Sequence, residues 1–183
     1  HKFDRGDIKS ALGQVETTKH DAGVAWGSVH WQYLEDLAKV TPHEATPLNL
    51  AKEIYVRENT KSGQVLKPIG SDLEPGDELV VRLVLRTDRD MEFVHMNDQR
   101  GSGTEPVNVL SGNRYQDGLA YYESTRDASS HFFIDYLPKG TYVFEYPVKV
   151  FHRGRYQSGI ANIQSMYAPE FNSHSASQWL EVK

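Results

Sequence analysis

Apolar residues recur at every second position along much of the chain, and this period is typical of strands that bury one face. The pattern is clearest in "ELVVRLVLRT" (78–87) and "GTYVFEYPVKVFH" (140–152), and it also occurs in "PLNLAKEIYVRE" (47–58) and "SHFFIDYL" (130–137). In the first of these, Glu78, Arg82 and Arg86 fall on the opposite face. The residues predicted to face the core are Leu48, Leu50, Ile54, Val56, Leu79, Val81, Leu83, Leu85, Phe132, Ile134, Tyr136, Tyr142, Phe144, Tyr146, Val148 and Val150.

Glycine and proline clusters separate these runs. They include "EPGDE", "RGSGTEP", "SGNRYQDG", "LPKG" and "HRGR", all of which are typical of turns. Many short strands with such turns predict an all-β fold, an antiparallel β-sandwich running from about Pro47 to Lys183. Helical spacing occurs only in "YLEDLAKV" (33–40), which is short.

The first forty residues follow a different pattern. "GQVETTK" (13–19) and "GVAWGSVHWQYLED" (23–36) predict two strands joined at "HDAG", with Trp26 and His30 on one face and Trp31 mostly on the other. Two prolines and no periodicity follow in residues 41–47, which we interpret as a linker. The expected organisation is therefore a short β segment with a linker over residues 1–46, and the main sandwich over residues 47–183.

Composition excludes several classes of function. The chain has 183 residues, 38% of them hydrophobic and 25% charged, with a net charge of −5 and an isoelectric point near 5.9. No basic stripe points to a nucleic-acid partner. The absence of cysteine excludes disulfides, thiolate zinc sites and a cysteine nucleophile. The chain opens at His1 without an initiator methionine, and we interpret it as an excised or processed piece.

Candidate catalytic chemistry is sparse. There is no G-x-S-x-G elbow, and no pair among the eight histidines has zinc-ligand spacing. Asp88, Asp90 and Glu92 alternate in "RTDRDMEF" and could line one strand face as a calcium site. A solvated strand end with Arg86 and Arg89 balancing the charge is the preferred interpretation, so we expect no metal, with Asp88 and Asp90 as the only candidates. Nothing singles out a pair of carboxylates for glycoside hydrolysis.

Large aromatic residues leave one alternative open, a carbohydrate-binding or adhesin sandwich. Exposed rings stack on sugars, but small sandwiches also fill their cores with such rings, and we expect the core for most of them. The candidate rings are Trp26, Trp31, Trp179, Tyr115, Tyr121 and Tyr122.

The sequence "SMYAPEF" (165–171) raises a separate question. A strand beginning near Gly159 stops at Pro169, which lacks a backbone donor and favours extended geometry in the residue before it. Directly before this stop lie Met166 and Tyr167, and Glu170 follows it. A flexible thioether and an aromatic ring at a strand end either plug their own sandwich or contact another domain.

Several ordered motifs together resemble the C-terminal macroglobulin-like domain of bacterial alpha-2-macroglobulins. They are an "LP-x-G-x-Y-x-x-E-Y" strand, a "G-x-F/Y" turn, an "M-Y-x-P-E" turn and an upstream "G-x-A-W-G" strand, and "DRDMEFVHMNDQR" resembles the equivalent stretch of Bacteroidetes-type members. The matching residues are Leu137, Pro138, Gly140, Tyr142, Glu145, Tyr146, Gly154, Tyr156, Met166, Tyr167, Pro169, Glu170, Gly23, Ala25, Trp26 and Gly27.

The resemblance implies a macroglobulin-like, immunoglobulin-like sandwich within a large protease trap of the cell envelope. Residues 1–46 would be the last strands of the module that follows the thioester domain. The turn formed by Met166, Tyr167, Pro169 and Glu170 would lie against the thioester domain and keep water from its reactive bond. The Cys-x-Glu-Gln thioester motif is absent from this chain.

The resemblance also implies partners and a location. The partners would be the thioester domain, neighbouring macroglobulin domains and the proteases trapped by the whole protein. The domain would need no cofactor and would not be an enzyme. The location would be periplasmic or at the cell surface, through an anchor on the parent chain.

Overall fold

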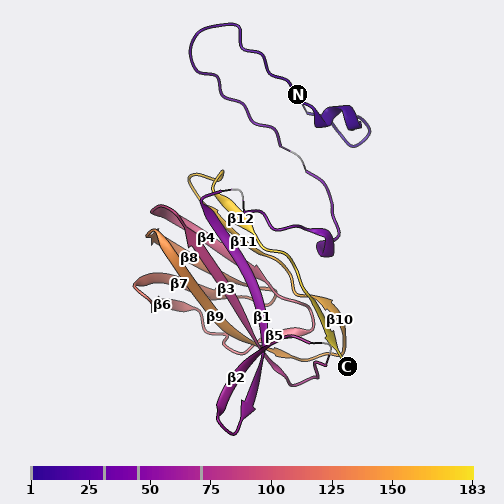
Figure 1. Ribbon diagram of the computed structural model, residues 1–183, viewed down its shortest axis with the longest axis vertical. Helices are drawn as coiled ribbons and strands as arrows, with labels where there is room; N and C mark the ends of the chain where they lie inside the picture. The colour runs from indigo at the N-terminus through magenta and orange to yellow at the C-terminus, as the bar shows by residue number, and fades with distance from the viewer. Residues whose placement is uncertain (1, 31, 45, 71) are drawn as a thin grey trace. The chain divides into compact units, whose positions relative to one another are not determined.

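The computed structural model describes residues 2–30, 32–44, 46–70 and 72–183 (Figure 1). The chain forms two compact units, one that ends at Leu34 and one that runs from Glu35 to Lys183. The first unit contains a short 3-10 helix, η1 (Ser10–Gly13), and its described residues form no strand. The strands predicted at 13–19 and 23–36 are therefore wrong for the residues that the structure describes. Trp31, which was assigned to the second of these strands, lies outside the described residues. The physical reason is that a strand needs a partner: Val24 is 79% exposed and Trp26 is 94% exposed.

The second unit opens with a single 3-10 turn, η2 (Leu37–Lys39), in place of a longer helix over 33–40. The Asp36 carboxylate accepts a hydrogen bond from the Ala38 amide at the start of this turn. Further along, the backbone of His43 pairs with that of His174 in both directions, so the expected linker is held against the sandwich.

The described residues of the second unit form thirteen strands. Their bounds are β1 (Leu48–Thr60), β2 (Gly63–Pro68), β3 (Glu78–Thr87), β4 (Met91–Gln99), β5 (Thr104–Pro106), β6 (Gly112–Gln116), β7 (Leu119–Thr125), β8 (Ser129–Leu137), β9 (Gly140–Val150), β10 (Gly154–Gln157), β11 (Ala161–Ser165), β12 (Asn172–His174) and β13 (Trp179–Val182).

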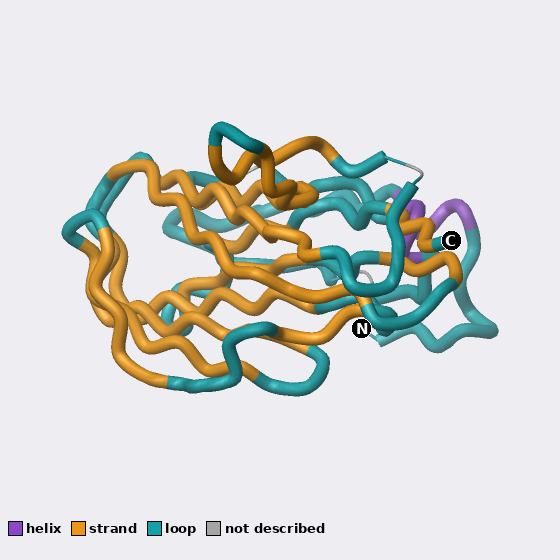
Figure 2. The backbone as a smooth tube through the Cα atoms, turned by 90° about the horizontal axis from the view of Figure 1, so that it is seen from below, coloured by secondary structure: helices purple, strands orange, loops and turns teal. Residues whose placement is uncertain are grey.

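These strands form the expected all-β antiparallel sandwich. One sheet has the order β2-β1-β3-β9-β5, the other has the order β12-β11-β4-β8-β7-β6, and β10 pairs with β13 separately. Figure 2 shows the strands lying in layers, and the hairpin of β1 and β2 extends beyond the rest of its sheet in Figure 1. Every strand pair is antiparallel, as the alternating pattern predicts.

The core lies between the two large sheets and follows the predicted register. Leu83 on β3 lies opposite Phe144 on β9, and both side chains are buried, whereas their neighbours Arg82 and Glu145 pair on the outer face. Phe144 in turn packs against Phe132 of the facing sheet, with ring centroids 5.3 Å apart. The other predicted core residues of β1, β3 and β9 are also buried, except Val56 and Tyr142, which are half-buried against the core.

Tyr136 is an exception, because it is 51% exposed and Leu137 is buried in its place. The pairing of β4 with β8 lacks a partner pair at Phe93 and Asp135, and the inward-facing positions change phase there on both strands. A simple alternation through 130–137 therefore places Tyr136 on the wrong face.

A buried ion pair links the two sheets. Lys52 of β1 donates to Asp98 of β4 over 2.6 Å, and its ammonium also reaches the carbonyls of Gln99 and Ser158 at 2.9 and 3.0 Å. Tyr146 of β9 donates to the other carboxylate oxygen of Asp98. Burial lowers the pKa of Lys52 and raises the pKa of Asp98, while the attraction between the two charges opposes both shifts.

Candidate interdomain surface

The Met166–Glu170 turn begins where β11 ends. Ser165 pairs with Val94 of β4, and the Met166 amide then donates to the carbonyl of Phe93 over 2.9 Å. The turn closes through the Phe171 amide, which donates to Ala168, and through the Ser165 amide, which donates to Phe171. Backbone hydrogen bonds therefore fix both ends of the turn: the start is bonded to β4, and the end is bonded to residues within the turn and to Ser165.

The side chains of this turn extend into solvent. Met166 is 57% exposed and Tyr167 is 82% exposed, and Pro169 and Glu170 are also exposed. A plug for the chain's own sandwich would be buried, so this arrangement disfavours that interpretation. The structure brings all four predicted residues together at one end of β11.

Phe93 completes this surface. Its ring lies 5.2 Å from the ring of Tyr167 at an interplanar angle of 85°, an edge-to-face arrangement that aromatic pairs prefer. Because Phe93 is itself 46% exposed, the pair forms an outward apolar surface together with Met166. Phe93 was not among the predicted site residues. The sequence does contain a signal, because the apolar residues Met91 and Phe93 occupy odd positions whereas Val94 and Met96, which follow, occupy even positions.

The turn between β3 and β4 lies beside this surface and contains Asp88 and Asp90. Arg89 lies over the ring of Phe171, 5.6 Å from its centroid. Asp90 accepts hydrogen bonds from the Tyr136 hydroxyl at 2.8 Å and the Lys139 amide at 2.7 Å, and these bonds lower the pKa of its carboxyl.

The placement of Asp88 and Asp90 on a strand is thus wrong, because they lie in a turn before β4 begins at Met91. Asp88 pairs with Arg89 at 2.9 Å. Within the described ranges, no three histidine or acidic side chains converge in a way that could hold a metal ion.

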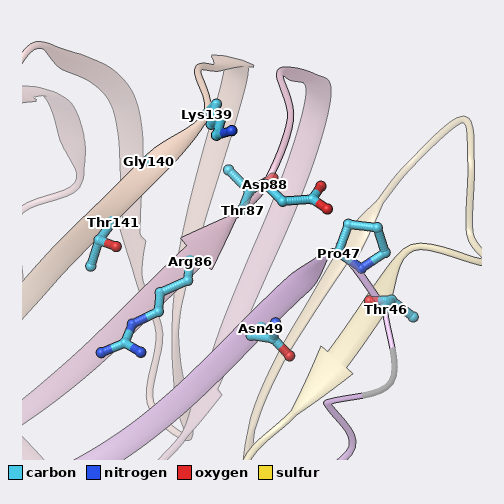
Figure 3. Close-up of a pocket in the computed structure, with 9 residues that line it drawn as sticks. All are labelled: Thr46, Pro47, Asn49, Arg86, Thr87, Asp88, Lys139, Gly140 and Thr141. Atoms are coloured by element: carbon cyan, nitrogen blue, oxygen red, sulfur yellow. The ribbon is translucent and has the colours of Figure 1, made fainter.

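An open groove of about 510 Å³ lies nearby and is lined by residues of β1, β3 and β9 (Figure 3). Figure 3 shows the Asp88 carboxylate directed toward Pro47, while the Arg86 guanidinium points in the opposite direction along β3. An enzyme's reactive groups must lie within hydrogen-bonding reach of one another or of one substrate atom. This groove does not have that arrangement.

The outer face of the second sheet carries the aromatic residues that bear on the carbohydrate alternative. His95 stacks on Phe133 at 4.6 Å and on His131 at 5.3 Å, and Tyr122 lies 6.4 Å from Phe133. Burial lowers the pKa of both histidines, whose ring nitrogens lie 3.0 Å apart. Phe133 and Tyr122 remain 44% and 43% exposed, so this face carries a group of aromatic side chains contributed by three neighbouring strands.

The other candidate rings are mostly outside the core, contrary to expectation. Among the candidates that the structure describes, only Tyr121 packs into it, against Phe132 and Phe144. Tyr115 is 76% exposed, and Arg155 covers one face of the exposed Trp179 at 4.0 Å. Tyr115 lies on the same outer face as Tyr122, because Asn113 of β6 pairs with Tyr122 of β7, whereas Trp179 lies on β13 outside the two large sheets.

Comparison with known families identifies the sandwich. Residues 48–170 match the family model of the bacterial alpha-2-macroglobulin MG10 domain. The chain belongs to this family. The matched range contains β1 to β11 and ends at Glu170, within the exposed turn and before β12.

Solved structures with the same fold come from Salmonella and Escherichia coli. Native E. coli alpha-2-macroglobulin from domain MG7 to the C-terminus is 16% identical with a TM-score of 0.63, covering 80% of this chain and 25% of that one. The E. coli protein activated by porcine elastase is 17% identical with a TM-score of 0.61, and the match covers 79% of this chain and 14% of that one. Salmonella alpha-2-macroglobulin reacted with methylamine is 20% identical with a TM-score of 0.59, and the match covers 79% of this chain and 10% of that one.

This MG10 chain thus spans a tenth to a quarter of those structures. No curated protein sequence matches it. None of the helices in the described ranges is long and apolar enough to cross a membrane.

Proposed function

We propose that this MG10 domain is a non-catalytic part of a bacterial alpha-2-macroglobulin protease trap, in which the Met166–Glu170 turn packs against the thioester domain and shields the thioester. The observation that carries the proposal is an apolar turn that is exposed and yet held at both ends by backbone hydrogen bonds. Exposed methionine and aromatic side chains are typical of protein interfaces, because they bury a large apolar area, and a turn with a fixed backbone loses less conformational freedom on docking.

The physical role of the turn would be to exclude water. A tyrosine ring and a thioether together cover an irregular apolar surface, and the phenol hydroxyl keeps one polar group at the rim. Glu170 is exposed in the same turn and would contribute to the polar rim that surrounds the central contacts of an interface.

The test uses the full-length parent protein with the double substitution Met166→Ala, Tyr167→Ala. Methylamine is added, and the release of free thiol is followed over time. Central contacts of an interface contribute about 1.4 kcal/mol or more, so we expect the rate of thiol release to rise about tenfold or more. The matched control is Tyr115→Ala, which removes an equally exposed ring from β6. An unchanged rate in the double variant, or an equal rise in the control, would contradict the shield.

Residues 1–46 would complete a neighbouring module of the same parent chain. The supporting observation is that Val24, Trp26 and Leu34 are largely exposed in a segment without strand partners. Extended segments of alternating apolar residues are stable only when a sheet pairs with them. Hydrogen exchange in the full-length protein should protect the amides of residues 23–34, while the 183-residue chain should exchange them rapidly.

The location that suits this function is the periplasm or the cell surface, with an anchor supplied elsewhere in the parent chain. A trap meets foreign proteases there, and a chain without cysteine needs no oxidative folding. Cell fractionation with an antibody against this domain would test this, and recovery in the cytosolic fraction would contradict it.

A further inference from the structure

Phe93 adopts a backbone conformation that a bulky residue rarely takes. Its φ is +51°, in the left-handed region, although it lies within strand β4. The only other non-glycine residue with positive φ in the described ranges is Asp117, which precedes Gly118 in the tight turn between β6 and β7. Asp-Gly turns of this kind require positive φ at both positions, so turn geometry accounts for Asp117 and not for Phe93.

The unusual conformation of Phe93 has two consequences at the exposed turn. Its carbonyl accepts the hydrogen bond from the Met166 amide at 2.9 Å, where the turn leaves β11. Its ring lies on the outer surface with its neighbour Tyr167 at 5.2 Å, in edge-to-face contact. Phe93 therefore holds the backbone where the turn begins and also contacts the ring of Tyr167, the most exposed side chain of the turn.

The backbone at Phe93 serves the fold, because the change of phase at this residue turns Met91 and Leu137 into the core. The position of the ring is not explained in this way, since the Phe93 ring is 46% exposed and contributes little to the core. Left-handed backbone in a residue with a side chain costs about 1–2 kcal/mol, and such strain persists mainly at functional sites.

We propose that Phe93 is a positioning residue for the shield: its strained backbone and its ring hold Tyr167 in the outward orientation in which it meets the thioester domain. The inference rests on the proposed function of the turn. With Phe93 in place, Tyr167 is ordered before docking, so less conformational freedom is lost when the domains meet.

The first experiment uses the 183-residue chain with Phe93→Gly and Phe93→Ala. Both variants lose the ring, and only glycine also relieves the strained backbone. Loss of the Phe93 ring current shifts Tyr167 in any case, so the readout is mobility: we expect the side-chain resonances of isotope-labelled Tyr167 to show couplings averaged over χ1 rotamers in both variants. The melting temperature of Phe93→Gly should exceed that of Phe93→Ala by about 2–4 °C, because the relief of about 1–2 kcal/mol of backbone strain outweighs the about 0.4–1 kcal/mol that glycine costs through the entropy of the unfolded chain.

The outcomes of this experiment are decisive. Unchanged Tyr167 couplings in both variants would overturn the positioning role, as would an alanine variant at least as stable as the glycine variant. The control is Phe151→Ala, which removes another half-exposed ring and should leave the Tyr167 couplings unchanged.

The second experiment separates this inference from the proposed function. In the full-length protein, thiol release with methylamine is compared for Phe93→Gly, Tyr167→Ala and the double variant. We expect both single variants to react faster, and the double variant to react no faster than Tyr167→Ala alone, since both changes affect one contact. If only Tyr167→Ala is faster, the shield stands and the role of Phe93 is wrong. If neither is faster, the shield is wrong, and the Tyr167 couplings alone decide whether Phe93 positions the ring.

Discussion

Aromatic rings meet edge-on or tilted in two regions of this domain, between the sheets and at the Met166–Glu170 turn. Phe144 and Phe132 lie 5.3 Å apart in the core, and Phe93 and Tyr167 lie 5.2 Å apart at the turn. The ring contacts are nearly the same, but Phe144 is 3% exposed and Tyr167 is 82% exposed. Since apolar stabilisation follows the area removed from water, the first pair should stabilise the fold and the second should act on a partner.

The same contrast applies to ion pairs. Lys52 and Asp98 are almost completely buried, whereas Arg82 and Glu145, on the outer face of the first sheet, are 31% and 41% exposed along their side chains. Buried charges depend on each other because neither can be hydrated, whereas exposed charges lose little when a partner is removed. Burial therefore decides where a substitution is costly.

The largest effect is expected from Phe144→Ala. The substitution leaves a cavity between the two sheets and should lower the free energy of unfolding by about 3–5 kcal/mol. Urea denaturation measures this, with the half-exposed Phe151→Ala as the matched control, for which we expect a much smaller loss. Equal losses of unfolding free energy in the two variants would contradict the argument that buried rings stabilise the fold more than exposed rings do.

A comparable loss is expected from Lys52→Met, which leaves the Asp98 carboxylate buried without its cation. Breaking a buried pair costs about 3–5 kcal/mol, against about 0–1 kcal/mol for Arg82→Ala on the surface. In the Lys52 variant the folded state should hold a proton on Asp98, whose pKa burial already raises. The unfolded chain releases that proton above pH ~4, so stability should fall as pH rises from there. A variant whose stability rises over this range would contradict the argument.

At the turn, Met166→Ala with Tyr167→Ala should change the stability of the 183-residue chain by less than about 1 kcal/mol, as exposed substitutions usually do. Thermal unfolding of the two proteins is the measurement. A loss of several kcal/mol would place the pair with the core and remove the basis for the shield.

The smallest effect concerns Asp90 in the turn beside Phe93. Hydrogen bonds from the Lys139 amide and the Tyr136 hydroxyl lower the pKa of its carboxyl in the folded state. Its contribution is therefore present above the unfolded pKa of about 3.9 and is lost as pH falls through the lower folded value. Asp90→Asn should flatten the acid side of the stability profile slightly, whereas a steeper acid side would contradict this assignment.

The strands were predictable where alternation was long and had partners within the chain. The register of β3 and β9 followed directly from Leu79 to Leu85 and from Tyr142 to Val150. The same reasoning failed for residues 23–36, because alternation indicates that a segment can pair and says nothing of whether a partner is present. It failed at Tyr136 because the interruption at Phe93 and Asp135 involves two strands at once.

The site was predictable only in part. Proline after a strand marked the Met166–Glu170 turn, and the ordered motifs connected it to the alpha-2-macroglobulin family, which the MG10 match confirms. Neither Phe93 beneath Tyr167 nor Lys52 beside Asp98 could be inferred, since each pair joins residues far apart in the chain.

The sequence by itself thus determined the fold class, most of the core register and the position of the turn, because these depend on local periodicity and on backbone chemistry such as that of Pro169. Only the tertiary structure decided which aromatic rings and charges are covered, and that Phe93 takes a left-handed conformation to meet the turn. Burial and strain arise when separate strands pack against one another, so they are properties of the assembled sheets and of no single segment.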